Sequence, residues 1–176
     1  MDLANHLKAT IRTVPDFPID GIQFRDITPV LSDPVLMGRV MDSFEEHART
    51  HAPTCVAGPE ARGFIFGPLL AMRLNLPFIP IRKPGKLPHT TVSVRYSLEY
   101  GTNELEMHED ALGPSDRVIL VDDLLATGGT VEAAASLISK AGAETVAAVF
   151  LIELEGLDGR VRLGPIPAYS LVELPA

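Results

Sequence analysis

Apolar residues near the start of the chain recur at the spacing of an α-helix. From Leu3 to Val14 they follow one another at intervals of four, four and three, which predicts an amphipathic helix ended by Pro15. Residues 16–29 are rich in Pro, Gly and Asp, and we expect an ordered loop because they also carry apolar side chains to bury. A capping Asp33 followed by proline predicts the start of a second helix.

Short apolar runs alternate with helical segments along the rest of the chain. The expected strands are residues 54–57, 78–81, 117–121, 145–152 and 168–172, and the expected helices between them lie around 66–74 and 130–140. Two partly alternating stretches, 90–100 and 104–108, predict a hairpin at the rim. Alternation of strands and helices is typical of an α/β fold with a mainly parallel sheet flanked by helices.

Composition narrows the class of protein. The chain has 176 residues, 46% of them hydrophobic and 22% charged, which predicts one globular domain over residues 1–176. Its net charge of -8 disfavours nucleic acid as a partner, and no apolar run approaches the roughly 20 residues of a membrane span. A single cysteine and no visible signal peptide indicate a cytoplasmic protein without a membrane partner.

The most informative segment follows the expected central strand. The strand leads to two carboxylates, Asp122 and Asp123, and then to a loop that opens a helix. The loop residues are Ala126, Thr127, Gly128, Gly129 and Thr130. Ligands of open α/β sheets bind at the carboxyl ends of strands, and a helix N-terminus with nearby glycines and hydroxyls favours phosphate. Two carboxylates beside a phosphate site favour a ligand with hydroxyl donors, so we predict a ribose-5-phosphate site.

A simpler interpretation of this segment exists. A lone Asp-Asp pair most often begins a turn and caps a helix, without binding a ligand. The full string of strand, acid pair and Thr-Gly-Gly-Thr loop makes that interpretation the weaker one. The segment also lacks the Gly-Lys-Ser/Thr of a Walker loop, and no G-x-G-x-x-G supports dinucleotide binding.

The string Val-Asp-Asp-Leu-Leu-Ala-Thr-Gly-Gly-Thr ending at Thr130 resembles the 5-phosphoribosyl-1-pyrophosphate (PRPP) motif of type I phosphoribosyltransferases, in particular the adenine phosphoribosyltransferase branch. Three further segments, beginning at Phe17, Glu60 and Arg82, resemble that family in the same order. The resemblance implies the type I phosphoribosyltransferase fold, with an N-terminal hood (about residues 1–30) and a lid hairpin (about 82–108). It also implies the reaction of adenine with PRPP to give AMP and pyrophosphate, Mg²⁺ as cofactor and a homodimer.

The resemblance assigns the turn after the first strand to pyrophosphate. Arg62 would bind it there, helped by a basic loop after the second strand that contains Arg82, Lys83 and Lys86. Without the resemblance, a solvated surface turn would explain Arg62 equally well. The resemblance also implies a cis peptide bond between Glu60 and Ala61. No protein cage for a metal is visible, so Mg²⁺ would bind through substrate oxygens.

The resemblance places the base on the N-terminal segment. Phe24 would stack on adenine, Gln23 and Arg25 would read its edge through backbone groups, and Leu124 would supply an apolar wall. Phe24 on its own would more often be a core residue.

The expected lid carries the remaining candidates. Glu99 would be the catalytic group that helps handle the purine proton, and His89 and Tyr100 would belong to the lid. Two alternatives stay open from the sequence: a phosphoribosyltransferase for another purine or for orotate, and a PRPP-sensing regulator without catalysis. The acidic charge of the chain disfavours the regulator, because such a protein usually needs a surface for nucleic acid.

Overall fold

A five-stranded parallel sheet forms the centre of the molecule. The computed structural model describes residues 1–97 and 102–176. The sheet order is β4-β3-β7-β8-β9, and each neighbouring pair is parallel. Its strands are β3 (Cys55–Pro59), β4 (Phe78–Ile81), β7 (Arg117–Leu125), β8 (Glu144–Glu155) and β9 (Ala168–Pro175). The carboxyl ends of β3, β4 and β7 therefore meet at one edge of the sheet, as predicted.

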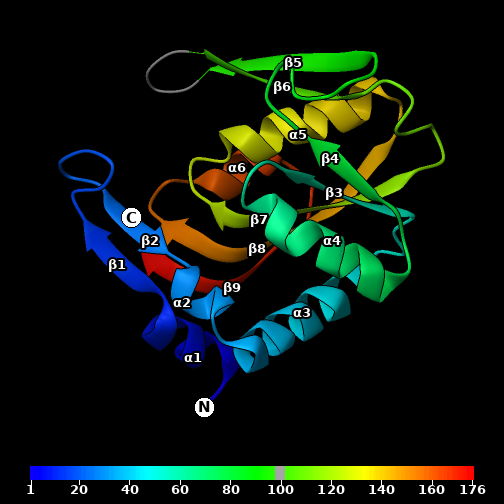
Figure 1. The fold of residues 1–176 in the computed structure, drawn as a ribbon. Helices are drawn as coiled ribbons and strands as arrows, with labels where there is room; N and C mark the ends of the chain where they lie inside the picture. Colours follow the sequence, from blue (N-terminus) through cyan, green and yellow to red (C-terminus); the bar gives the residue numbers. More distant parts are fainter. Residues whose placement is uncertain (98–101) are drawn as a thin grey trace.

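The sheet is buried on both faces because the middle of each central strand is an uninterrupted apolar run. On β7, Val118 and Leu120 pack toward one hydrophobic cluster and Ile119 and Val121 toward the other. The helices are α1 (Leu3–Thr10), α2 (Thr28–Leu31), α3 (Pro34–Arg49), α4 (Gly63–Leu74), α5 (Gly129–Lys140) and α6 (Gly159–Leu163). Figure 1 shows α3 and α4 on one side of the sheet and α5 on the other. Within residues 1–97 and 102–176, no helix has the length and apolar character needed to cross a membrane.

The start of α3 confirms the predicted cap. The Asp33 carboxylate accepts hydrogen bonds from the backbone N–H groups of Val35 and Leu36, at 2.9 and 3.0 Å. Pro34 occupies the first turn, where a backbone donor has no helical partner.

The prediction of a helix as far as Val14 is wrong. The first helix ends at Thr10, and β1 (Arg12–Pro15) pairs antiparallel with β2 (Gln23–Asp26). Val14 lies opposite Phe24 in this ladder, so strand pairing replaces the helical contact that the periodicity suggested. The expected loop of residues 16–29 accordingly contains a strand and the start of the short helix α2. Figure 1 shows this two-stranded sheet standing apart from the central sheet, on the side of the carboxyl edge of β7.

The predicted hairpin consists of β5 (Thr91–Ser97) and β6 (Thr102–His108). It packs over α5, where the Lys140 ammonium donates to the Ser93 carbonyl at 2.7 Å. The hairpin is joined to the end of β4 through reciprocal backbone hydrogen bonds between Arg82 and Glu106. It therefore lies above the helical layer on one face rather than extending the central sheet (Figure 1).

Two features near the predicted phosphate site differ from the prediction: the end of one strand and the presence of one helix. The central strand was expected to end at residue 121, but β7 continues to Leu125 because β8 is long enough to pair with it that far. The acid pair is therefore part of a strand. The short helix α6, after β8, was not predicted, since five residues are too few to show a period.

Candidate functional site

A cavity of about 150 Å³ lies where β7 meets α5. It is lined by Arg62 and by the continuous run of residues 122–131. The structure thus brings together every residue predicted to bind ribose-5-phosphate: Asp122, Asp123, Ala126, Thr127, Gly128, Gly129 and Thr130. The loop opens directly onto the N-terminus of α5, where backbone N–H groups and the helix dipole favour an anion.

Gly128 sets the shape of the loop formed by residues 126–130, which we call the phosphate loop after the ligand predicted for it. Its φ of +83° lies in the left-handed region, which residues with a side chain rarely adopt. A Cβ atom at this position would also lie 2.5 Å from the carbonyl oxygen of Gly159 in α6. Conformation and close packing both require glycine here, so the loop is held in one shape by the neighbouring helix.

The two carboxylates of β7 have different surroundings. Asp123 is only 4% exposed and forms an ion pair with the Arg62 guanidinium. Asp122 is half-buried, and its Oδ1 accepts the backbone N–H of Asp123 at 2.9 Å. Burial, and next the adjacent Asp123 carboxylate, raise the pKa of Asp122 well above its ordinary value. The site therefore combines one ion-paired acid with one that resists ionisation.

Phe24 lines a second cavity, of about 240 Å³, between the N-terminal segment and the central fold. Its lining residues are Phe24, Arg25, Asp26, Ile27, Thr28, Leu31, Arg62 and Ile65. The Phe24 ring meets the edge of Phe17 at a centroid distance of 5.1 Å, and the Arg62 Cζ atom lies 6.0 Å from the Phe24 centroid. This cavity has an aromatic wall of the kind that a flat heterocycle would stack upon.

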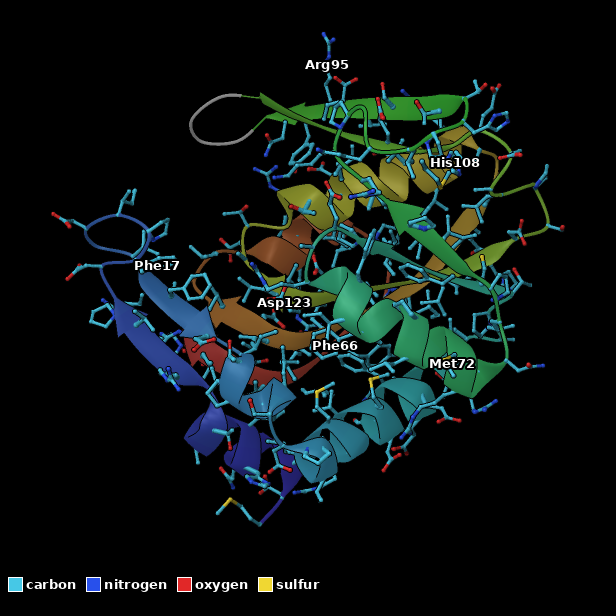
Figure 2. All side chains as sticks on the ribbon, in the orientation of Figure 1. Phe17, Phe66, Met72, Arg95, His108 and Asp123 are labelled. Carbon is cyan, nitrogen blue, oxygen red and sulfur yellow. The ribbon has the colours of Figure 1, made fainter. Side chains whose placement is uncertain are left out.

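Arg62 belongs to both cavities. It precedes α4, at the turn after β3, and lines the phosphate-loop cavity on one side and the Phe24 cavity on the other. Burial opposes its charge, but the Asp123 carboxylate outweighs this effect and raises the pKa of Arg62. Figure 2 shows Asp123 in the middle of the molecule, between the N-terminal segment that carries Phe17 and the helix α4. A permanent cation thus stands where the two cavities meet.

The basic residues after β4 lie outside the linings of these two cavities. The Arg82 Nε donates to Glu60 at 2.6 Å, and its Nη1 donates to the Lys86 carbonyl at 2.9 Å. The backbone N–H of Lys83 donates to the other Glu60 oxygen at 3.1 Å. The side chains of Lys83, Lys86 and His89 are exposed. Arg82 therefore ties the turn after β3 to the basic loop, and the peptide bond between Glu60 and Ala61 in that turn is cis, as expected.

The remaining candidate residues have separate positions. Gln23 is exposed on β2, and Leu124 lines the phosphate-loop cavity but not the Phe24 cavity. The predictions for Glu99 and Tyr100 fall on residues outside those that the structure describes.

The contribution of α6 to this site was not predicted from the sequence. This helix follows β8, the neighbour of β7, so it reaches the same edge of the sheet. Its Gly159 and Arg162 contact the phosphate loop, and Arg162 Nη1 lies 3.2 Å from the Glu132 carboxylate in the first turn of α5. The position of the segment after an apolar strand was the only signal for it in the sequence.

A metal bound wholly by protein side chains finds no support in the described residues. No group of three or more His, Cys, Asp or Glu side chains lies there in an arrangement that could hold an ion. The two carboxylates of β7 are the acids that line the phosphate-loop cavity, and one of them is already paired with Arg62. This donor set fits an ion held mainly by substrate oxygens and water.

Fold and site together define a phosphoribosyltransferase. Residues 31–171 match the family described as "Phosphoribosyl transferase domain". The chain belongs to this family, in its adenine phosphoribosyltransferase branch. The adenine phosphoribosyltransferase of Methylobacterium sp. (strain 4-46) is 54% identical over 169 residues, which cover 95% of this chain and 93% of the relative.

Solved structures agree with this membership. The adenine phosphoribosyltransferase of Thermoanaerobacter pseudethanolicus superposes with a TM-score of 0.95 at 46% identity, over 98% of this chain and 100% of that one. The enzyme of Saccharomyces cerevisiae, solved with adenine and an imino-altritol bisphosphate, gives a TM-score of 0.91 at 36% identity, over 96% and 98%. The predicted type I phosphoribosyltransferase fold and the predicted branch are confirmed.

Proposed function

We propose that this site transfers the 5-phosphoribosyl group from PRPP to adenine and releases AMP and pyrophosphate. The observation that carries the proposal is the pair of cavities that share Arg62. Bond formation requires the anomeric carbon of the sugar and a nitrogen of the base to meet, and two adjoining cavities allow that approach. The yeast relative solved with adenine and a sugar-like bisphosphate supports the same pair of ligands.

The phosphate loop would hold the ribose-5-phosphate half of PRPP. Backbone N–H groups of residues 126–130 would donate to the 5-phosphate, and the hydroxyls of Thr127 and Thr130 would add donors. Asp122 and Asp123 would accept hydrogen bonds from the ribose hydroxyls. Asp123 is paired with Arg62 in the structure. When PRPP binds, the two side chains would exchange partners, so that the carboxylate accepts from the ribose hydroxyls and the guanidinium donates to the pyrophosphate.

Pyrophosphate would leave toward the turn after β3 and the basic loop. Arg62 would donate to it directly, and the exposed Lys83 and Lys86 side chains are long enough to close over it. Arg82, which is engaged with Glu60 and the Lys86 carbonyl, would act mainly by holding the turn and the loop together. A Mg²⁺ ion bound through pyrophosphate oxygens, ribose hydroxyls and water would neutralise charge on the leaving group.

Adenine would enter the second cavity. Phe24 would stack on the ring, backbone groups of Gln23 and Arg25 would read its edge, and Leu124 would contact it from the sugar side. Glu99, which lies between β5 and β6 in the sequence, would help the purine lose its proton as the new bond forms. The N-terminal segment would serve as the hood and the segment 82–108 as a lid that excludes water.

The remaining proposals concern the setting of the protein. A homodimer and a cytoplasmic location both fit salvage of a free base by an enzyme of this family. Sedimentation of the purified protein tests the dimer, and fractionation of the source cells tests the location.

Product analysis tests the function. Purified protein is incubated with PRPP, Mg²⁺ and, in separate reactions, adenine, guanine, hypoxanthine or orotate. We expect AMP with adenine and little product with the other bases. Comparable turnover of guanine or hypoxanthine would contradict the specificity, and PRPP binding without turnover of any base would favour a regulator.

A Glu99→Ala variant tests the proton-handling role. General acid–base assistance is typically worth about 100-fold or more, so kcat should fall by at least that factor while PRPP binding is kept. Glu109→Ala, which removes an exposed acid just after β6, is the matched control and should keep its turnover. A Glu99→Ala variant with near-normal kcat would remove Glu99 from the mechanism.

A further inference from the structure

The first turn of α5 carries an acid close to the proposed 5-phosphate. Glu132 is the acidic residue of that turn, and α5 is the helix that begins at the phosphate loop. An acid in a first turn normally stabilises a helix by opposing its dipole. Here the same helix N-terminus is proposed to bind a phosphate group, so an unopposed Glu132 carboxylate would repel PRPP. The chain, with a net charge of -8, adds to this repulsion.

Arg162 stands beside this acid. Its Nη1 donates to the Glu132 Oε2 at 3.2 Å, and both side chains are about half exposed, 47% and 48%. Arg162 reaches Glu132 because α6 packs against the phosphate loop: a Cβ atom at Gly128 would lie 3.1 Å from the Arg162 Cβ. A Cβ atom at Gly129 would lie 3.9 Å from the Arg162 Nη1. Figure 1 shows α6 next to the start of α5.

Neither residue lines the phosphate-loop cavity. Because the pair lies outside this lining, its effect on PRPP would act through the electric field or through the shape of the loop. An exposed ion pair contributes little to folding stability. Its position at an anion site gives it a different role, because charges within about one Debye length of a phosphate still affect its binding.

We infer that Arg162 is a positioning residue of the PRPP site, which holds the Glu132 carboxylate in an ion pair and cancels its repulsion of the 5-phosphate. This inference rests on the proposed function only in placing PRPP at the phosphate loop. It predicts that Arg162 affects the binding of PRPP and does not affect the binding of adenine. It also makes the need for Arg162 conditional on the charge of Glu132.

The experiment compares Arg162→Ala, Glu132→Gln and the double variant with the wild-type protein. Calorimetry gives Kd for PRPP, and steady-state kinetics give kcat and the KM of each substrate at low ionic strength. We expect Arg162→Ala to weaken PRPP binding by about three- to tenfold, as estimated for one unopposed charge near a phosphate in a mostly aqueous setting. The KM for adenine and the melting temperature should stay close to wild type, and Arg162→Lys should keep most of the affinity.

The double variant separates the possible causes. We expect Glu132→Gln to restore PRPP affinity in the Arg162→Ala background, and added salt to shrink the effect of Arg162→Ala. An unchanged Kd for PRPP in Arg162→Ala would overturn the inference. A double variant as weak as Arg162→Ala would overturn it as well, because Arg162 would then act on the phosphate or the loop by itself.

A control and an independent readout complete the design. Arg49→Ala removes an exposed arginine that pairs with Glu45 on α3, so it changes the net charge by the same amount away from the phosphate loop. Its PRPP affinity should match wild type. Because Kd is measured without turnover, a wild-type protein that binds PRPP but makes no AMP would count against the proposed function and leave the test of Arg162 intact.

Discussion

Replacing Gly159 by alanine tests whether α6 holds the phosphate loop. A Cβ atom at this position would lie 2.2 Å from the carbonyl oxygen of Ala126 and 3.0 Å from two side-chain carbons of Leu125. The Ala126 carbonyl is backbone, so it cannot turn away as a side chain could. Relieving the contact requires α6 and the phosphate loop to separate by about 1 Å, since ordinary contacts between non-bonded atoms begin near 3.5 Å.

The size of the effect follows from this displacement. Overpacking of a dense interior typically costs about 1–3 kcal/mol, which for a chain of this length lowers Tm by roughly 2–12 °C. Misplacing catalytic geometry by 1 Å can reduce the rate by about 100-fold. We therefore expect Gly159→Ala to lose about two orders of magnitude in kcat/KM for PRPP while most of the protein stays folded at 25 °C. Steady-state kinetics and thermal melting measure the two effects.

The control is the same substitution where there is space. A Cβ atom at Gly38, in the second turn of α3, would meet nothing within 4 Å. Alanine favours a helix interior over glycine by up to about 1 kcal/mol, so Gly38→Ala should raise Tm slightly and keep kcat/KM. Wild-type kcat/KM for PRPP in Gly159→Ala would refute the reasoning, because it would show that the loop does not depend on α6.

Two further variants probe the acid pair and the N-terminal segment. Burial and the Asp123 carboxylate raise the pKa of Asp122, so the folded protein keeps the Asp122 proton to higher pH than the unfolded chain does. Ionisation of Asp122 therefore lowers the folding stability as the pH rises from about 4 through the raised pKa. Urea titrations without ligand should find Asp122→Asn more stable than wild type at pH 7 but not below pH 4, and its kcat/KM for PRPP should be reduced. Equal stability of the two proteins at both pH values would contradict the raised pKa of Asp122. Arg25→Ala should raise the KM for adenine about tenfold and leave the KM for PRPP unchanged. The Arg25 guanidinium donates hydrogen bonds to Thr13 and to the Pro175 carbonyl, and it therefore holds β2 beside the Phe24 cavity. Arg12→Ala, which removes an exposed arginine paired with Asp26 on the same ladder, is its control, and an equal rise in both variants would contradict the role of Arg25.

The sequence predicted the fold correctly where strands are buried on both faces of the sheet. The predicted strands 117–121 and 145–152 are apolar on both faces from residues 118 and 146 onward, and both proved to be central strands. A covered parallel sheet buries both sides of a strand, which explains this pattern. The prediction was wrong between Ile11 and Val14, where apolar spacing fits a helix but Val14 pairs with Phe24. The pairing depends on a partner ten residues away, which a local period cannot contain.

The contiguous part of the candidate site could also be predicted from the sequence, and the parts that depend on packing between elements could not. Residues 122–130 are contiguous, so their sequence already contains the strand end, the acids and the phosphate loop that the structure brings together. Arg62 was predicted for pyrophosphate, but its pair with Asp123 and its place between two cavities depend on how α4 packs on β7. Arg162 and Gly159 were missed because nothing in their own segment indicates phosphate; only the packing of α6 on Gly128 connects them to it.

The arrangement of charge, more than its total, explains how an acidic chain can bind a substrate with several phosphates. Three acids near the proposed PRPP site are paired with an arginine: Asp123 with Arg62, Glu132 with Arg162, and Glu60 with Arg82. Asp122 forms none of these pairs and instead resists ionisation, because it is half-buried beside another carboxylate. Repulsion of phosphate by these carboxylates is thus reduced by ion pairing or, at Asp122, by a raised pKa. Removing any one arginine should therefore weaken PRPP binding most at low ionic strength, where unopposed charge acts over the longest distance.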